Sequence, residues 1–98
     1  MVTTISGAEF ERICRGIARD RESIIRHNPV GTEDEILLWM LLSCLVGYMS
    51  LSESETPCFP GSPNAETYRE AIKFILRGRM AEDFDADRII DRMLDHKP

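Results

Sequence analysis

The sequence predicts an all-α fold, a compact four-helix bundle that forms a single domain over residues 1–98. Apolar residues recur at intervals of three and four along most of the chain, which is the spacing of one helix face. Residue pairs typical of helix N-termini precede these stretches, and no stretch alternates between apolar and polar residues as a half-buried strand does. With 43% hydrophobic and 30% charged residues, the chain can bury one small core.

The first helix is expected over residues 7–27. Ser6 followed by Glu9 forms a capping box at its start, and Pro29 disfavours helical geometry just beyond its end. Its apolar face consists of Phe10, Ile13, Cys14, Ile17, Ala18, Ile24 and Ile25.

The second helix is expected over residues 33–51, where Thr32 and Glu35 form another capping box. The short connection before it, residues 28–31, predicts that the first two helices form an antiparallel hairpin. Residues 36–49 read ILLWMLLSCLVGYM and are apolar on nearly every side, which is typical of a buried, central helix. This stretch is shorter than the roughly 20 residues that a membrane span needs, so no membrane association is expected.

The remaining helices are expected over residues 63–78 and 86–95, with a loop at 52–62 that is rich in proline. Ser62 and Pro63 suit the start of the third helix, and Asp85 suits the N-cap of the fourth.

The second helix has two different sides. Large residues gather on the side expected to face the core: Leu38, Leu41, Leu42, Leu45, Tyr48 and Met49. The opposite side carries Ile36 and the candidate interface residues Trp39, Met40, Ser43, Gly47 and Ser50. The small residues there would allow another backbone to approach closely, and Trp and Met are enriched at interfaces. We therefore expect a protein partner here, most simply a second copy of the chain in a homodimer. The alternative is that a later helix of the same chain covers this side.

Arginine residues mark a second candidate surface on the first helix. Arg12, Arg15, Arg19 and Arg26 form a stripe opposite the apolar face. This stripe could contact an anion or an acidic partner, or it could be a solvated face neutralised by nearby glutamates. Arg21 instead lies in the middle of the apolar face, where a guanidinium requires either a carboxylate from residues 33–35 or a bound anion.

Catalytic and metal-binding chemistry finds little support in the sequence. Cys14, Cys44 and Cys58 lack the spacing of a disulfide framework or a metal site, and they suggest reduced thiols. No nucleophile signature surrounds Cys58, and no glycine-rich phosphate loop is present. We therefore expect neither an enzyme, nor a metal, nor a cofactor, and we expect Cys58 to be an inert or redox-sensitive surface thiol.

The charge and the N-terminal sequence narrow the functional class. A net charge of −5 disfavours direct binding to nucleic acid. The first residues lack the pattern of a signal peptide, so a cytoplasmic location is expected. The sequence thus favours a small intracellular protein-interaction module: an adaptor, regulator or inhibitor that acts by surface contact and self-associates. The alternative is a helical binder of a small ligand or anion in a pocket between helices that involves Arg21 or Tyr68.

Overall fold

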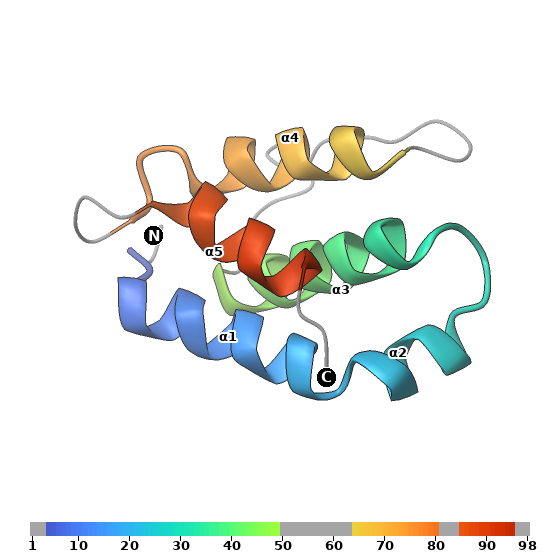
Figure 1. The fold of residues 1–98 in the computed structure, drawn as a ribbon. Helices are drawn as coiled ribbons and strands as arrows, with labels where there is room; N and C mark the ends of the chain where they lie inside the picture. Colours follow the sequence, from blue (N-terminus) through green and yellow to red (C-terminus); the bar gives the residue numbers. More distant parts are fainter. Residues whose placement is uncertain (1–3, 50–63, 81–84, 96–98) are drawn as a thin grey trace.

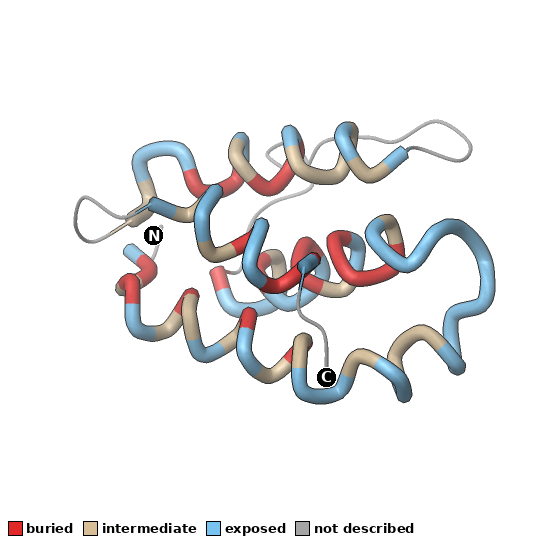
Figure 2. Tube along the Cα trace, viewed as in Figure 1, coloured by how far each residue is buried: buried red, intermediate tan, exposed pale blue. Residues whose placement is uncertain are grey.

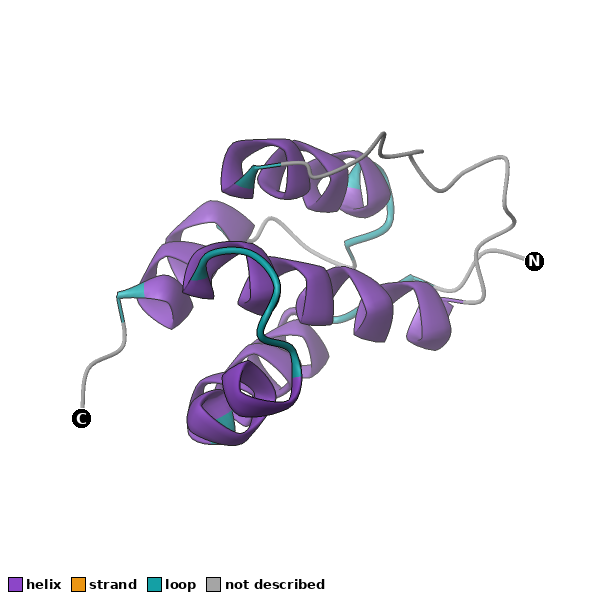
Figure 3. Cartoon of the chain, turned by 90° about the vertical axis from the view of Figure 1, so that its right-hand side faces the viewer, coloured by secondary structure: helices purple, strands orange, loops and turns teal. Residues whose placement is uncertain are grey.

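The computed structural model describes residues 4–49, 64–80 and 85–95, and in these residues the chain forms helices and no strand (Figure 3). The predicted all-α class is therefore confirmed for the described chain. The helices are α1 (Gly7–Arg19), α2 (Arg21–His27), α3 (Glu33–Met49), α4 (Ala65–Leu76) and α5 (Ala86–Leu94). The radius of gyration is 12.9 Å, close to the value of about 12.6 Å expected for a compact chain of this length.

The four-helix bundle is not confirmed, because two helices occupy the stretch predicted as one at residues 7–27. Asp20 lies between α1 and α2 with φ −94° and ψ 15°. Its N–H donates to the Gly16 carbonyl and its carbonyl accepts from the Ile24 N–H, both at 3.0 Å, so hydrogen bonding continues through the bend. Aspartate is a weak helix former, which favours a break here. Because α2 intervenes between α1 and α3, the predicted two-helix hairpin is not confirmed either.

Side chains cap four of the helices. The Ser6 hydroxyl accepts from the Glu9 N–H at 3.1 Å, and the Thr32 hydroxyl accepts from the Glu35 N–H at 3.2 Å, as the capping boxes predict. Asp85 accepts from the Arg88 N–H at 3.0 Å. The N-cap of α4 is Asn64, whereas the predicted start at Ser62 and Pro63 lies outside the described residues, as do the loop 52–62 and the last two residues of the predicted second helix.

The core lies between α1, α3, α4 and α5, whose inward sides hold most of the buried residues (Figure 2). α3 contacts α1, α2 and α4, and its buried residues are Ile36, Leu37, Leu38, Leu41, Leu42, Leu45 and Met49. Its place at the centre of a bundle stays a prediction. α3 and α4 run in the same direction across Figure 1, and α5 packs against α1.

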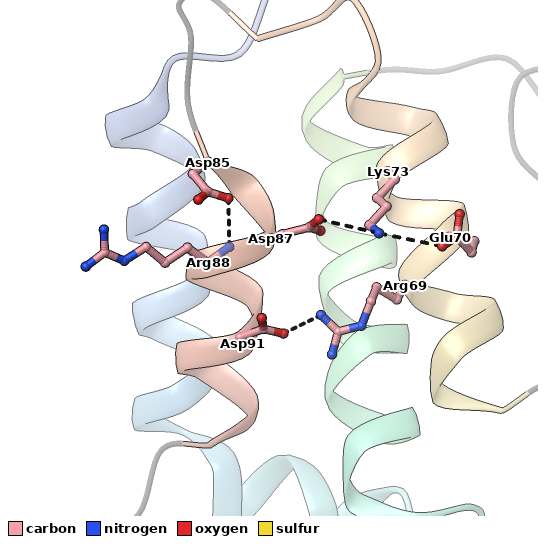
Figure 4. Close-up of polar contacts among 7 residues, drawn as sticks. All are labelled: Arg69, Glu70, Lys73, Asp85, Asp87, Arg88 and Asp91. Atoms are coloured by element: carbon pink, nitrogen blue, oxygen red, sulfur yellow. Dashed lines mark hydrogen bonds and ion pairs between the residues drawn. The ribbon is translucent and has the colours of Figure 1, made fainter.

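Polar contacts join α4 to α5 (Figure 4). The Arg69 guanidinium lies 2.6 Å from the Asp91 carboxylate, and the Lys73 ammonium lies 3.4 Å from Asp87. Such partly exposed ion pairs contribute roughly 0–1 kcal/mol each. The two pairs bridge α4 and α5, while burial of Ile90, Met93 and Leu94 anchors α5 in the core.

Candidate functional site

One side of α3 is left uncovered by the other described helices. Trp39 is 48% exposed, Ser43 and Gly47 are exposed, and Met40 is partly buried. No described atom lies within 4 Å of the position that a Cβ on Gly47 would occupy. These four residues, with the Trp39 ring at one end, are called the exposed α3 face below. The fifth candidate interface residue, Ser50, lies outside the described residues.

Two residues of α3 lie differently from the sequence interpretation. Tyr48, expected on the core side, is 41% exposed. Ile36, expected on the opposite side, is 7% exposed and belongs to the buried set. Ile36 lies near the beginning of α3, where α2 contacts this helix. Tyr48 lies near the other end, where its hydroxyl can bind water.

A cleft opens beside the exposed α3 face, between the α2–α3 turn and α4. Its volume is about 460 Å³, and its lining residues are His27, Asn28, Pro29, Val30, Gly31, Glu35, Ile36, Trp39, Met40 and Tyr68. The rings of Trp39 and Tyr68 have centroids 5.3 Å apart and planes tilted by 49°, which is within the range of favourable aromatic pairs. This region is called the aromatic cleft below.

Glu35 gives the aromatic cleft an acidic group. Burial raises the pKa of the Tyr68 hydroxyl, and the negative charge of Glu35 raises it further. Gly31 has φ +97°, and a Cβ at this position would lie 3.0 Å from the Glu35 Oε2 atom. Glycine is favoured at residue 31 for two reasons: its backbone is left-handed, and the Glu35 carboxylate lies close to it.

The arginine stripe is largely matched by carboxylates that lie close to it in the sequence. Arg12 pairs with Glu9, Arg15 lies 2.7 Å from Glu11, and Arg19 lies 3.3 Å from Asp20. The three arginine side chains are about three-quarters exposed, at 75%, 77% and 77%. This local pairing favours the interpretation of a solvated, neutralised face. Arg26 is exposed in α2, beyond the bend at residue 20.

Arg21 joins three helices. Its guanidinium donates to the Glu33 carboxylate at 2.7 Å and to the Leu94 carbonyl at 3.3 Å, near the end of α5. The side chain is only 19% exposed, whereas that of Glu33 is 61% exposed. One of the carboxylates expected across the turn is therefore its partner. Arg21 and Tyr68, the two alternative pocket residues, line different hollows of the described structure.

The described cysteines offer no activated thiol. Burial raises the pKa of the Cys14 thiol to about 12, and the charge of Glu11 adds to this effect. Cys44 is exposed at the surface of α3, but the neighbouring side chains still shield its thiol in part and so raise its pKa. Cys58 lies outside the described residues. In residues 4–49, 64–80 and 85–95, no three side chains of His, Cys, Asp or Glu are grouped to hold a metal.

Sequence reasoning selected Trp39 and Met40, but it did not select Glu35 and it did not place Tyr68 beside Trp39. Glu35 and Trp39 are four residues apart, so they share a helix face, which is a signal that the sequence contains. The contact of Tyr68 in α4 with Trp39 in α3 could not be predicted from the sequence, because the two residues are far apart in the chain. None of the described helices is long and apolar enough to cross a membrane. No family model, no curated protein and no solved structure matches this chain.

Proposed function

We propose that the protein is a small intracellular interaction module, an adaptor, regulator or inhibitor that acts by surface contact and self-associates. The observation that carries this proposal is the exposed α3 face. α3 is apolar around most of its circumference, yet Trp39 is 48% exposed on the same side as the exposed residues Ser43 and Gly47. An exposed tryptophan beside small residues suits a helix contact, because tryptophan is enriched at interfaces and small residues allow a close approach.

The proposed contact is centred on Ser43 and Gly47, with Trp39 and Met40 beside them and Ser50 at the end. Small side chains allow a second helix to approach α3 closely, and a neighbouring tryptophan can supply much of the binding energy. Burial of this face would provide affinity, and the acidic surface would select among partners. The proposal includes no catalytic step, no cofactor and no direct binding to nucleic acid.

The test is the solution mass of the wild type and of Gly47→Leu, measured by light scattering on a sizing column. We expect the wild type to be a dimer and Gly47→Leu to be a folded monomer. No described atom lies within 4 Å of the Gly47 Cβ position, so we expect the fold to survive this substitution. The leucine would, however, obstruct the close approach of a second α3.

Gly16→Leu is the matched control, because Gly16 also lies within a helix and no described atom lies within 4 Å of its Cβ position. This variant should remain a dimer. A wild type that is monomeric at all concentrations tested, or an equal effect of the two substitutions, would contradict self-association through α3. Circular dichroism of each variant establishes that the fold is retained.

The alternative, an anion-binding pocket at Arg21, has weaker support. Arg21 already contacts a carboxylate and a backbone carbonyl, as a structural arginine does. The hollow beside it is lined by acids as well as by arginines, among them Asp20, Glu22 and Glu33. An anion would have to displace Glu33 from Arg21, so this surface is a weaker candidate for the functional site than the exposed α3 face.

A further inference from the structure

The aromatic cleft combines features that select a particular kind of ligand. Its entrance is apolar, since Val30 is 84% exposed and Trp39 is 48% exposed. Its volume of about 460 Å³ lies within the range of ligand-binding pockets, so it has room for a long side chain. The chemistry of that side chain follows from two elements of the lining, the aromatic pair and the carboxylate.

The aromatic pair supplies a surface that attracts cations. Trp39 and Tyr68 come from α3 and α4, and their ring centroids lie 5.3 Å apart. The negative electrostatic potential of a ring face favours a positive group, most strongly for tryptophan. A planar cation can in addition lie flat against such a ring.

The carboxylate supplies the opposite charge at the same site. Glu35 lies one turn before Trp39 in α3, and both residues line the cleft. In the described part of the chain, Glu35 has no Lys, Arg or His within ion-pair distance, whereas Glu33 from the same turn is paired with Arg21. Without a side chain, Gly31 leaves room for the Glu35 carboxylate beside the turn.

We infer that the aromatic cleft binds an arginine side chain presented by a protein partner, with the guanidinium stacked on Trp39 and paired with Glu35. Arginine fits better than lysine because its guanidinium is planar, is more weakly hydrated and can pair with a carboxylate through two parallel hydrogen bonds. The inference rests on the proposed interaction function and specifies the chemistry of the partner. The net charge of −5 adds a general attraction for a basic segment.

The test is a titration of the full chain with the peptide acetyl-Gly-Arg-Gly-amide at pH 7.5. Trp39 is the one tryptophan in the sequence, so its fluorescence and its indole NMR signal report directly on the cleft. We expect a saturable shift of both signals, with a dissociation constant on the order of millimolar for a single side chain. The lysine peptide should bind more weakly. The peptide with citrulline, a neutral isostere of arginine, should not produce the shift.

Matched variants connect the effect to Glu35. Glu35→Gln removes the charge in the cleft and should weaken binding of the arginine peptide by about fivefold or more. Asp34→Asn removes one charge from the same turn, but Asp34 does not line the cleft in the described structure, so binding should stay within about twofold. Tyr68→Leu should weaken binding through loss of the aromatic wall, which provides a second route should Glu35→Gln disturb the fold.

Three results would overturn the inference: no saturation by the arginine peptide, equal binding of the citrulline peptide, or equal effects of Glu35→Gln and Asp34→Asn. The solution mass of the same samples keeps this test separate from the test of self-association. Because both proposed contacts use Trp39, the titration is repeated with the Gly47→Leu monomer, and a folded Gly47→Leu monomer that does not bind the arginine peptide removes the arginine site alone. A monomer that binds the peptide removes self-association alone.

Discussion

The two described cysteines differ mainly in access to solvent. Cys14 is 3% exposed and its pKa is raised to about 12 by burial and by Glu11, whereas Cys44 is exposed on α3. The raised pKa means that the folded state holds the Cys14 proton more tightly than the unfolded state does. The resulting stability is fully present below pH 9, the ordinary value, and is lost as the pH rises toward 12.

We therefore expect the free energy of unfolding to fall steeply above pH 9, and to fall less in Cys14→Ala. Urea unfolding at several pH values between 8 and about 10.5 measures this dependence. The cavity left by the alanine lowers stability at every pH, so the slope with pH, and not the absolute value, is the relevant quantity. Cys44→Ala serves as the control and should keep most of the slope. Parallel curves for the wild type and Cys14→Ala would contradict the assignment.

Helix starts show where sequence reasoning succeeds at the scale of an element. Ser6, Thr32 and Asp85 cap helices as their local patterns indicate, because an N-cap depends on a side chain and a backbone N–H only two or three residues away. α4 is less simple. Ser62 and Asn64 are both good N-cap residues, and Asn64 is the one observed.

For α4 we expect Asn64→Ala to lower the free energy of unfolding by about 1 kcal/mol, because the Thr67 N–H loses the side-chain oxygen 2.9 Å away. Asn64→Asp should retain most of the stability, since a carboxylate accepts the same hydrogen bond and also favours the helix N-terminus. Urea unfolding of both variants provides the measurement. If the two substitutions cost the same, the capping role assigned to Asn64 is wrong.

The bend at Asp20 shows what local pattern cannot provide. The apolar spacing continues from α1 into α2, so one helix was predicted for residues 7–27. Asp20 is a weak local signal for the break, and the contacts that Arg21 makes beyond it, with Glu33 and with the end of α5, come from distant parts of the sequence. The aromatic cleft was missed for the same reason, because Tyr68 reaches Trp39 from another helix. Whether the exposed α3 face contacts a partner stays a prediction.

At the scale of the whole molecule, Arg21 links parts that are far apart in the sequence. We expect Arg21→Met to lower the free energy of unfolding by about 1–2 kcal/mol, mainly because the Leu94 carbonyl loses its donor. Glu33→Gln should cost less, about 0–1 kcal/mol, because Glu33 is largely exposed. Urea unfolding gives the two values. Amide hydrogen exchange should be faster in α5 of Arg21→Met than in α5 of Glu33→Gln.

The opposite order of effects, or unchanged exchange in α5, would mean that the ion pair matters and the contact with α5 does not. Arg21 would then hold only α2 and α3 together. The proposed role of Arg21 as an anion site makes a different prediction, since removal of the arginine would abolish phosphate-induced stabilisation of the fold.

Another long-range contact has a consequence for the order of events in folding. The Ile5 N–H donates to the Arg79 carbonyl at 2.6 Å, Ile5 forms an isolated bridge with Met80, and its side chain is fully buried. This contact closes a loop that includes α1 to α4, so its entropic cost is high unless the helices have already assembled. It should therefore form after the rate-limiting step. A shorter side chain at Ile5 would then accelerate unfolding and leave the rate of folding almost unchanged.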